Sequence, residues 1–335
     1  MGNAQFSAET DEKGAFVRQQ SAFREAVSTD GSTAFPAEAG RYHLYVSYAC
    51  PWASRTIILR QLKGLEDAIP MTVLDPERDE KGWRFTEEEG DPVNGFDYLA
   101  EAYRLTDPGF DQRVTVPVLW DTKENRAVSN ESAEILRMLN SEFNEYAENP
   151  GLDLYPEEKR DEIDALNDRI YTSINNGVYR TGFASTQEAY EEAFVELFEA
   201  LDWVDDILGS KRYLTGDTIT EADWRLFVTL IRFDSVYYGH FKCNQRRIVD
   251  YDNLSGYLRD LYQQPGIADT VNLEHIKRHY YRTHPQINPT RIVPMGPVLD
   301  LDSPPERPLP LSRSTAGRPG RCRNGLIPFR APYVE

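Results

Sequence analysis

The segment Cys50-Pro51-Trp52-Ala53 constrains the fold most strongly, because it places a cysteine where a strand ends and a helix begins. Alternating apolar residues at 43–46 predict the strand, and residues 56–62 predict the helix. Pro51 suits the first helical position, since it has no N–H to leave unpaired. The unpaired N–H groups and the positive end of the helix dipole favour a Cys50 thiolate, and Arg55 adds positive charge one turn later. A buried structural cysteine is the alternative interpretation.

The first half of the chain alternates strands and helices. We expect strands at 41–49, 71–74, 114–121 and 127–128, and helices at 51–64 and 133–143. A long connection at 76–112 separates the second strand from the third. This order, with a cysteine after the first strand and a proline entering the third, predicts an α/β thioredoxin-like domain.

Pro117 lies within an apolar run, where a proline forfeits one hydrogen bond of the sheet. A cis Val116-Pro117 bond at a sheet edge facing Cys50 explains its presence. An ordinary proline in an edge strand is the alternative.

The second half of the chain predicts an all-helical domain. Apolar residues recur at helical spacing in four regions, which are residues 157–176, 186–208, 220–237 and 251–263. Thr220 and Asp223 have the spacing of a capping box, with Ile219 and Trp224 as its hydrophobic staple. We expect that device to serve folding only.

The domain organisation follows from these patterns. Residues 1–40 form a polar N-terminal extension with a weak helical patch at 15–27, residues 41–150 the thioredoxin-like domain, and residues 155–302 the helical domain with its extension. Residues 303–335 are rich in arginine, proline, serine and glycine, and this composition predicts a disordered tail without an assigned role.

Charge and cysteine content exclude several classes of function. The net charge of −18 argues against a nucleic-acid partner and suits a high-salt cytoplasm, which indicates a halophilic source. No segment approaches the roughly 20 apolar residues that span a bilayer, and the N-terminus has no apolar signal sequence, so we expect a cytoplasmic protein. The three cysteines are scattered and form no CxxC motif, so we expect a small molecule to supply the resolving thiol. His240 and Cys243 lack further ligands at useful spacing, so no metal site is expected.

Several dispersed motifs resemble the Xi class of the glutathione transferase superfamily. The resemblance covers residues 10–301 and rests on Cys50-Pro51-Trp52-Ala53, Gly82-Trp83-Arg84-Phe85, residues 113–121, Ser129-Asn130-Glu131-Ser132, residues 175–179, His240-Phe241-Lys242-Cys243 and residues 287–294. It implies an all-α glutathione transferase C-terminal domain after the thioredoxin-like one. It also implies a glutathionyl-hydroquinone reductase, which converts a glutathionyl-hydroquinone and glutathione into hydroquinone and oxidised glutathione.

The resemblance assigns a role to each candidate residue. Cys50 attacks the thioether sulfur and forms a mixed disulfide with glutathione. The residues implied to contact the hydroquinone are Tyr179, Tyr237 and Tyr280, whose phenols can also supply a proton. The residues implied to bind glutathione are Trp83, Arg113, Val116, Glu131 and Ser132. No bound cofactor is expected, and glutathione or γ-glutamyl-cysteine serves as cosubstrate.

Two other functions stay open at this stage. One is a general monothiol oxidoreductase, similar to omega-type transferases or glutaredoxins, that acts on mixed disulfides. The other is a non-catalytic binding module with the transferase fold. Members of the family are commonly dimers, so a homodimer is expected.

Overall fold

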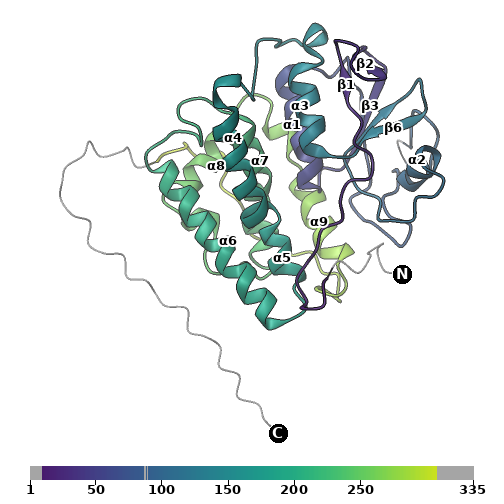
Figure 1. Ribbon diagram of the computed structural model, residues 1–335. Helices are drawn as coiled ribbons and strands as arrows, with labels where there is room; N and C mark the ends of the chain where they lie inside the picture. The colour runs from purple at the N-terminus through teal and green to yellow at the C-terminus, as the bar shows by residue number, and fades with distance from the viewer. Residues whose placement is uncertain (1–9, 87, 89, 308–335) are drawn as a thin grey trace.

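A four-stranded mixed sheet forms the N-terminal domain (Figure 1). The computed structural model describes residues 10–86, 88 and 90–307. The strand order is β4-β3-β5-β6, in which β3 pairs with β4 in parallel and β5 is antiparallel to both β3 and β6. The strands are β3 (Tyr42–Val46), β4 (Met71–Val73), β5 (Val118–Asp121) and β6 (Arg126–Ser129). This sheet and its helices confirm the predicted thioredoxin-like fold.

Three helices accompany the sheet, namely α1 (Pro51–Lys63), α2 (Leu99–Thr106) and α3 (Ser132–Ser141). Helices α1 and α3 lie together between the sheet and the helical domain (Figure 1). Helix α1 has Pro51 at its first position and ends at Gly64, whose φ of 62° is left-handed and suits glycine. The predicted strand-to-helix junction is therefore confirmed.

Two predictions for the connection and the third strand need correction. The connection at 76–112 contains α2, a short helix that the glycines and acidic residues around it concealed. Strand β5 begins only at Val118, because the N–H of Thr115 donates to the hydroxyl of Tyr103 (3.2 Å) and not to another strand. The Val116-Pro117 bond is cis as predicted. Its predicted edge position is wrong, since β5 lies between β3 and β6.

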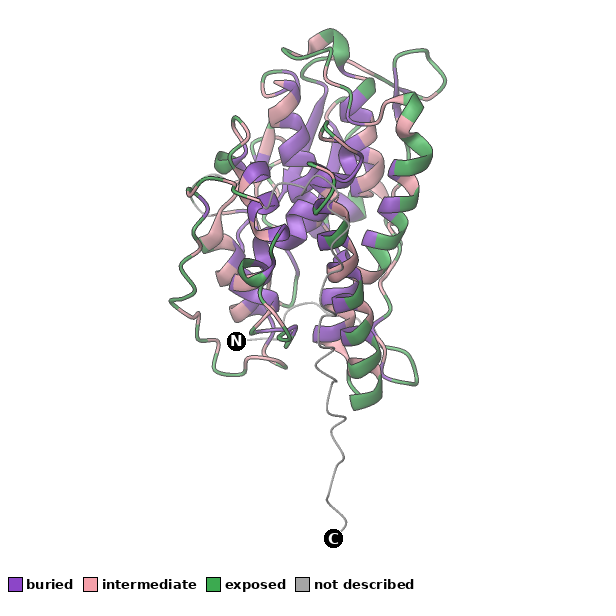
Figure 2. Ribbon diagram, turned by 90° about the vertical axis from the view of Figure 1, so that its left-hand side faces the viewer, coloured by how far each residue is buried: buried purple, intermediate pink, exposed green. Residues whose placement is uncertain are grey.

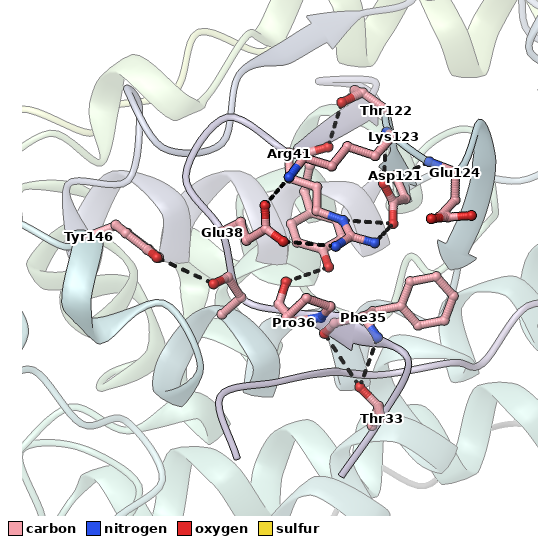
Figure 3. A network of polar contacts seen from close by, with 12 residues as sticks. Thr33, Phe35, Pro36, Glu38, Arg41, Asp121, Thr122, Lys123, Glu124 and Tyr146 are labelled. Atoms are coloured by element: carbon pink, nitrogen blue, oxygen red, sulfur yellow. Dashed lines mark hydrogen bonds and ion pairs between the residues drawn. The ribbon is translucent and has the colours of Figure 1, made fainter. Parts of the chain in front are cut away.

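A buried ion pair joins the start of β3 to the end of β5 (Figure 3). Nε and Nη2 of Arg41 donate to Oδ2 of Asp121 at 2.9 and 2.6 Å, and Asp121 is fully buried. Oδ1 of Asp121 accepts from the N–H groups of Lys123 (2.9 Å) and Glu124 (3.2 Å), which shapes the turn before β6. Arg41 also donates to Glu38 (3.0 Å). The network thereby fixes the β5–β6 hairpin to the chain that follows β2 (Phe35–Pro36).

The C-terminal domain is helical, as predicted. Its helices are α4 (Arg160–Ile170), α5 (Gly177–Phe183), α6 (Gln187–Leu208), α7 (Glu221–Arg232), α8 (Leu254–Tyr262) and α9 (Leu273–Thr283). Helices α4 and α7 continue into π-turns, η3 (Tyr171–Asn175) and η4 (Phe233–Tyr237). Single 3₁₀ turns are η1 (Asn144–Tyr146), η2 (Glu157–Lys159), η5 (Ile248–Asp250) and η6 (Ala268–Thr270). Helices α5 and α9 were not predicted, since α5 is short and α9 is rich in charged residues.

Helix α7 forms the centre of this domain, and its residues are buried with the exception of Arg225. The predicted capping box is confirmed, because the N–H of Thr220 donates to Oδ2 of Asp223 at 2.8 Å. Asp223 also accepts from Leu214 N–H (3.0 Å) and from the hydroxyl of Tyr257 (2.7 Å). Figure 2 shows buried residues in the interior of both domains and exposed residues on the outer faces of the helices. None of the described helices combines the length and apolarity that a membrane span requires.

Residues 14–28, here called the N-terminal strap, run along the boundary between the two domains (Figure 1). The carbonyl of Gly14 accepts from Ser185 N–H (3.0 Å) in the helical domain, and Glu25 N–H donates to Val128 (3.0 Å) in β6. The strap ends in β1 (Val27–Ser28), which pairs with β2. The helical patch predicted at 15–27 is therefore wrong, since this backbone pairs with other segments and not with itself.

The last described residues pack against the helical domain. Arg307 donates to Oδ2 of Asp260 in α8 at 2.9 Å and to the carbonyl of Arg212 at 2.5 Å. The disorder predicted for residues 303–335 is therefore wrong for 303–307. The rest of that tail, with Cys322, lies outside the described residues.

Candidate active site

Cys50 occupies the N-cap position of α1, and 9% of its surface is exposed. Its thiol lies 3.4 Å from the carbonyl oxygen of Val116, to which it donates. Arg232 of α7 holds the preceding turn by donating to the carbonyls of Tyr48 (2.8 Å) and Ala49 (3.1 Å). Chain segments from both domains therefore fix the position of the sulfur.

The protonation state of Cys50 differs from the sequence-based expectation. Burial raises the pKa of the thiol, whereas the N–H groups of Ala53 and Trp52 and the charges of Arg232 and Arg18 lower it. The pKa remains raised overall, so in this arrangement burial opposes the preference for the thiolate that the sequence predicts. The physical reason is that packing around Cys50 removes the water that would solvate the anion.

Arg55 contacts the helical domain, and the charged side chains with the largest effect on Cys50 are Arg232 and Arg18. Its guanidinium donates to Asn175 (2.9 Å) and to the hydroxyl of Ser132 (3.4 Å), and it lies over the ring of Trp52. Asn175 in turn donates to the hydroxyl of Thr229 at 2.7 Å. Arg55 therefore joins α1 to the helical domain, and burial lowers its pKa to about 9.

A pocket covers Cys50 at the domain boundary and brings six of the predicted site residues together. These residues are Cys50, Trp83, Arg113, Val116, Tyr179 and Tyr280. Phe16 and Arg18 from the strap also line it. The cavity volume is about 80 Å³, far below the several hundred Å³ of a pocket that encloses a small ligand.

Three tyrosine hydroxyls form a cluster beside this pocket. Tyr280 of α9 lies 2.5 Å from the oxygen of Tyr179 in α5 and 3.0 Å from that of Tyr237 in η4. Tyr237 is fully buried behind the other two and does not itself line the pocket. Burial raises the pKa of all three phenols, so they keep their protons at neutral pH. The cluster is thus able to donate a proton into the pocket.

A second groove adjoins the pocket and has a volume of about 260 Å³. Its lining includes Glu131 and Ser132, two residues predicted to bind the thiol donor, and it shares Arg113 and Val116 with the pocket. Oε1 of Glu131 caps α3 by accepting from Ala133 N–H at 3.1 Å. A carboxylate and the N-terminus of a helix therefore face one groove, which suits a ligand with a separated ammonium and carboxylate.

Trp83 and Arg113 line the pocket, and each contacts a neighbouring segment of the chain. The ring of Trp83 stacks on His279, with centroids 5.0 Å apart and planes inclined by 10°. The backbone of Arg113 pairs with the side chain of Gln19, since its N–H donates to Oε1 and its carbonyl accepts from Nε2, both at 3.1 Å. The strap thus positions the segment that carries Arg113.

The sequence analysis missed the strap as part of the site. Phe16 and Arg18 line the pocket, and Ser21 donates to Oε2 of Glu131 at 2.9 Å. These side chains lie in a polar stretch whose local pattern predicted only a weak helix, so nothing in the local sequence marked them as site residues.

Three buried histidines surround the tyrosines, and two of them, His279 and His284, also line the pocket. Nε2 of His240 is 3.0 Å from Nδ1 of His284, and Nδ1 of His279 is 2.6 Å from the carbonyl of Pro76. Burial lowers the pKa of His240 to about 4 and that of His279 to about 3. In the part of the chain that the structure describes, no three His, Cys, Asp or Glu side chains form a group able to hold a metal ion.

Two family models match the chain. The model of the glutathione S-transferase N-terminal domain matches residues 49–142, and the model of the C-terminal domain matches residues 187–260. The first contains Cys50 and Glu131, and the second contains α7.

Two curated proteins resemble the chain over most of their length. The glutathionyl-hydroquinone reductase PcpF of Sphingobium chlorophenolicum is 51% identical over 291 residues, which cover 86% of this chain and 91% of that protein. The glutathionyl-hydroquinone reductase YqjG of Escherichia coli is 52% identical over 301 residues, which cover 87% and 92%.

Solved structures show the same similarity. An Xi-class glutathione transferase from Natrialba magadii has a TM-score of 0.82 and 56% identity, covering 84% of this chain and 87% of that one. The glutathione-bound structure of the Escherichia coli protein has a TM-score of 0.83 and 52% identity, covering 85% and 96%.

Proposed function

The chain belongs to the glutathione transferase family, among its Xi-class members, and on this premise we propose that it is a glutathionyl-hydroquinone reductase with Cys50 as nucleophile. The observation that carries the proposal is the shared pocket of Cys50, Tyr179 and Tyr280. A sulfur nucleophile and a pair of protonated phenols face the same cavity, and reductive cleavage of an aryl thioether needs a nucleophile and a proton donor.

The first chemical step forms one disulfide. The Cys50 thiolate attacks the sulfur of the glutathionyl-hydroquinone, so an S–S bond forms and the C–S bond breaks. The electron pair of the broken bond passes to the ring carbon, which takes a proton from the tyrosine cluster or from water. Cys50 is oxidised to the mixed disulfide, and the aromatic carbon is reduced.

The second step regenerates the enzyme. A second glutathione thiolate attacks the glutathione sulfur of the mixed disulfide, which releases oxidised glutathione and the Cys50 thiolate. In sum, one adduct and one glutathione give one hydroquinone and one oxidised glutathione. No second cysteine of the protein is needed, because the cosubstrate supplies the resolving thiol.

The groove beside the pocket suits the thiol donor. Glu131 is placed to pair with the ammonium of a γ-glutamyl group, and the N-terminus of α3 at Ser132 favours its carboxylate. Val116 offers its backbone to the cysteinyl part, and Trp83 and Arg113 hold the glycyl end. A γ-glutamyl-cysteine donor would use the same groove without the last two contacts.

Substitution of Cys50 tests the proposal directly. Cys50→Ala is expected to abolish release of hydroquinone from a glutathionyl-hydroquinone, while Cys243→Ala retains it, because Cys243 is fully buried away from the pocket. Mass spectrometry of the wild type treated with the adduct alone should show glutathione on Cys50. Full turnover by Cys50→Ala would reject the mechanism. Faster turnover of a glutathione mixed disulfide than of the adduct would favour the general monothiol oxidoreductase.

We also propose a cytoplasmic homodimer adapted to high salt. The net charge of −18 supports the salt adaptation, since screening relieves the repulsion between acidic side chains. Unfolding at low salt with recovery at molar salt, followed by circular dichroism, is the expected behaviour. Light scattering in the same buffers measures the mass of the assembly, and a monomeric mass would contradict the dimer.

A further inference from the structure

Arg18 belongs to the N-terminal strap. Its side chain lines both the pocket over Cys50 and the adjoining groove. Its guanidinium carbon lies 4.6 Å from the ring centroids of Trp52 and of Tyr179, and 5.2 Å from that of Phe16. Its Nε donates to Oδ1 of Asn176 at 2.8 Å. Three rings and one amide therefore hold the side chain in a single place.

One nitrogen of this guanidinium remains available. Nη2 of Arg18 is buried and has no hydrogen-bond partner among the described residues. An unpaired donor on a charged group is costly unless an anion is present to accept from it. Arg232, the other cation that acts on Cys50, already donates to Tyr48, Ala49 and Ser54. Arg18 therefore brings to the pocket a buried donor from which an anion can accept.

The charge of the pocket is opposite to that of the protein. The charged side chains that line it are Arg18, Arg78 and Arg113, and no carboxylate is among the described lining residues. The titratable and charged groups that face Cys50 from the surrounding elements are Arg18 of the strap, Arg78 and Arg113 of the loops, Tyr179 of α5, Arg232 of α7, His279 and Tyr280 of α9, and His284. In a chain with a net charge of −18, such a site is built for an anion.

We propose that Arg18 stabilises the Cys50 thiolate, so that the N-terminal strap carries an essential part of the active site. The proposal rests on the proposed function, in which Cys50 is the nucleophile. Burial disfavours a charged sulfur, so a fixed positive charge at the pocket wall decides how much thiolate forms at neutral pH. Arg18 acts on the reaction through Cys50, because its positive charge stabilises the thiolate.

The pH dependence of alkylation tests this role without relying on turnover. In a Cys243→Ala/Cys322→Ala background, Cys50 is the sole thiol, and its rate of reaction with iodoacetamide is measured from about pH 6 to about pH 11, a range that extends above the ordinary pKa of a thiol because that of Cys50 is raised. Arg18→Gln is expected to move the midpoint upward by about one pH unit, the effect of removing one nearby opposite charge. In Arg18→Lys the midpoint is expected to stay close to that of the wild type, because lysine keeps the positive charge.

Two matched variants separate charge from strap attachment. Arg24→Gln removes a cation from the same strap, but one that is paired with Glu134 on the surface, and it should leave the midpoint unchanged. Gln19→Ala removes the pairing with Arg113 and keeps Arg18, so it should also leave the midpoint unchanged. An unshifted midpoint in Arg18→Gln, or an equal shift in Arg24→Gln or Gln19→Ala, would overturn the inference.

The same experiment distinguishes failure of the inference from failure of the proposed function. If Cys50→Ala keeps full reductase turnover, the proposed function fails whatever the alkylation profile shows. If Cys50→Ala is inactive and Arg18→Gln alkylates like the wild type, only the role of Arg18 fails. Unfolding midpoints of all variants, measured by circular dichroism, establish that each is folded at the assay temperature.

Discussion

The hydroxyl oxygens of Tyr179 and Tyr280 lie 2.5 Å apart, although 101 residues separate them in the chain. Tyr179 belongs to α5 and Tyr280 to α9, and both face the pocket over Cys50. The short contact means that one phenol donates to the other, while Tyr237 lies 3.0 Å from Tyr280. A proton given up by one hydroxyl is therefore replaceable from its neighbour.

Removal of the Tyr280 hydroxyl is expected to lower kcat for a glutathionyl-hydroquinone about 100-fold, the lower part of the range for general acid catalysis. Tyr280→Phe keeps the ring, so its packing against Phe241 and His284 is retained. Tyr281→Phe is the matched control, because that hydroxyl donates to the carbonyl of Ser235 (3.3 Å) outside the cluster. Equal losses in the two variants would contradict the role of Tyr280.

The charge of Glu131 is expected to set the affinity for the thiol donor. Glu131→Gln keeps an oxygen that caps α3 but loses the negative charge, so KM for glutathione should rise about tenfold with little change in stability, as for one lost charge-assisted hydrogen bond. Glu134→Gln serves as the control. Glu134 lies in the first turn of the same helix, and its carboxylate forms an ion pair with Arg24. An unchanged KM in Glu131→Gln would exclude this contact.

Loss of Asp121 is expected to destabilise the fold by about 3–5 kcal/mol, the cost of removing one partner of a buried ion pair, although Arg41 keeps its contact with Glu38. Asp121→Ala removes the partner of Arg41 and the acceptor for the turn at Lys123. Urea unfolding should show the loss as a lower midpoint. Lys123→Ala, whose side chain is 58% exposed, should change stability by less than about 1 kcal/mol. Similar midpoints for the two variants would show that the ion pair contributes little.

Stability is expected to fall as the pH falls below about 6.5, the ordinary pKa of histidine. Burial lowers the pKa of His43 and His240 to about 4 and that of His279 to about 3. The unfolded chain therefore binds protons that the folded chain excludes. Between the pKa of a histidine in the folded chain and its pKa in the unfolded chain, each such residue lowers the free energy of unfolding by about 1.4 kcal/mol per pH unit. Above about pH 6.5 this cost vanishes, because both states are neutral at these residues.

Urea titrations at pH 7.5, 6.5 and 5.5 measure this dependence. His43→Gln should reduce the slope between pH 6.5 and 5.5 by about one proton, since Gln keeps a partner for Thr72 without titrating. A free energy of unfolding that is flat over this range would show that the histidines take up protons in the folded state.

The sequence predicted the local structure at Cys50 because that structure depends on neighbouring residues. Pro51 fixes the start of α1, and the cis bond before Pro117 follows from a proline in an apolar run. The capping box of α7 likewise spans only Thr220 to Asp223. Helix α9 was harder to predict, since it packs a narrow buried stripe beneath many charged side chains.

The sequence by itself determined the strand-to-helix junction, the two-domain order and the motifs that place the chain in its family, since these depend on residues close together in the chain. Only the tertiary structure decided the environment of the Cys50 thiol, because burial raises its pKa while Arg232 and Arg18, from two segments distant in the chain, lower it. It also decided that Arg55 joins the domains and that the strap lines the site. Electrostatic energies depend on distance and solvation in space, and neither is encoded in local sequence.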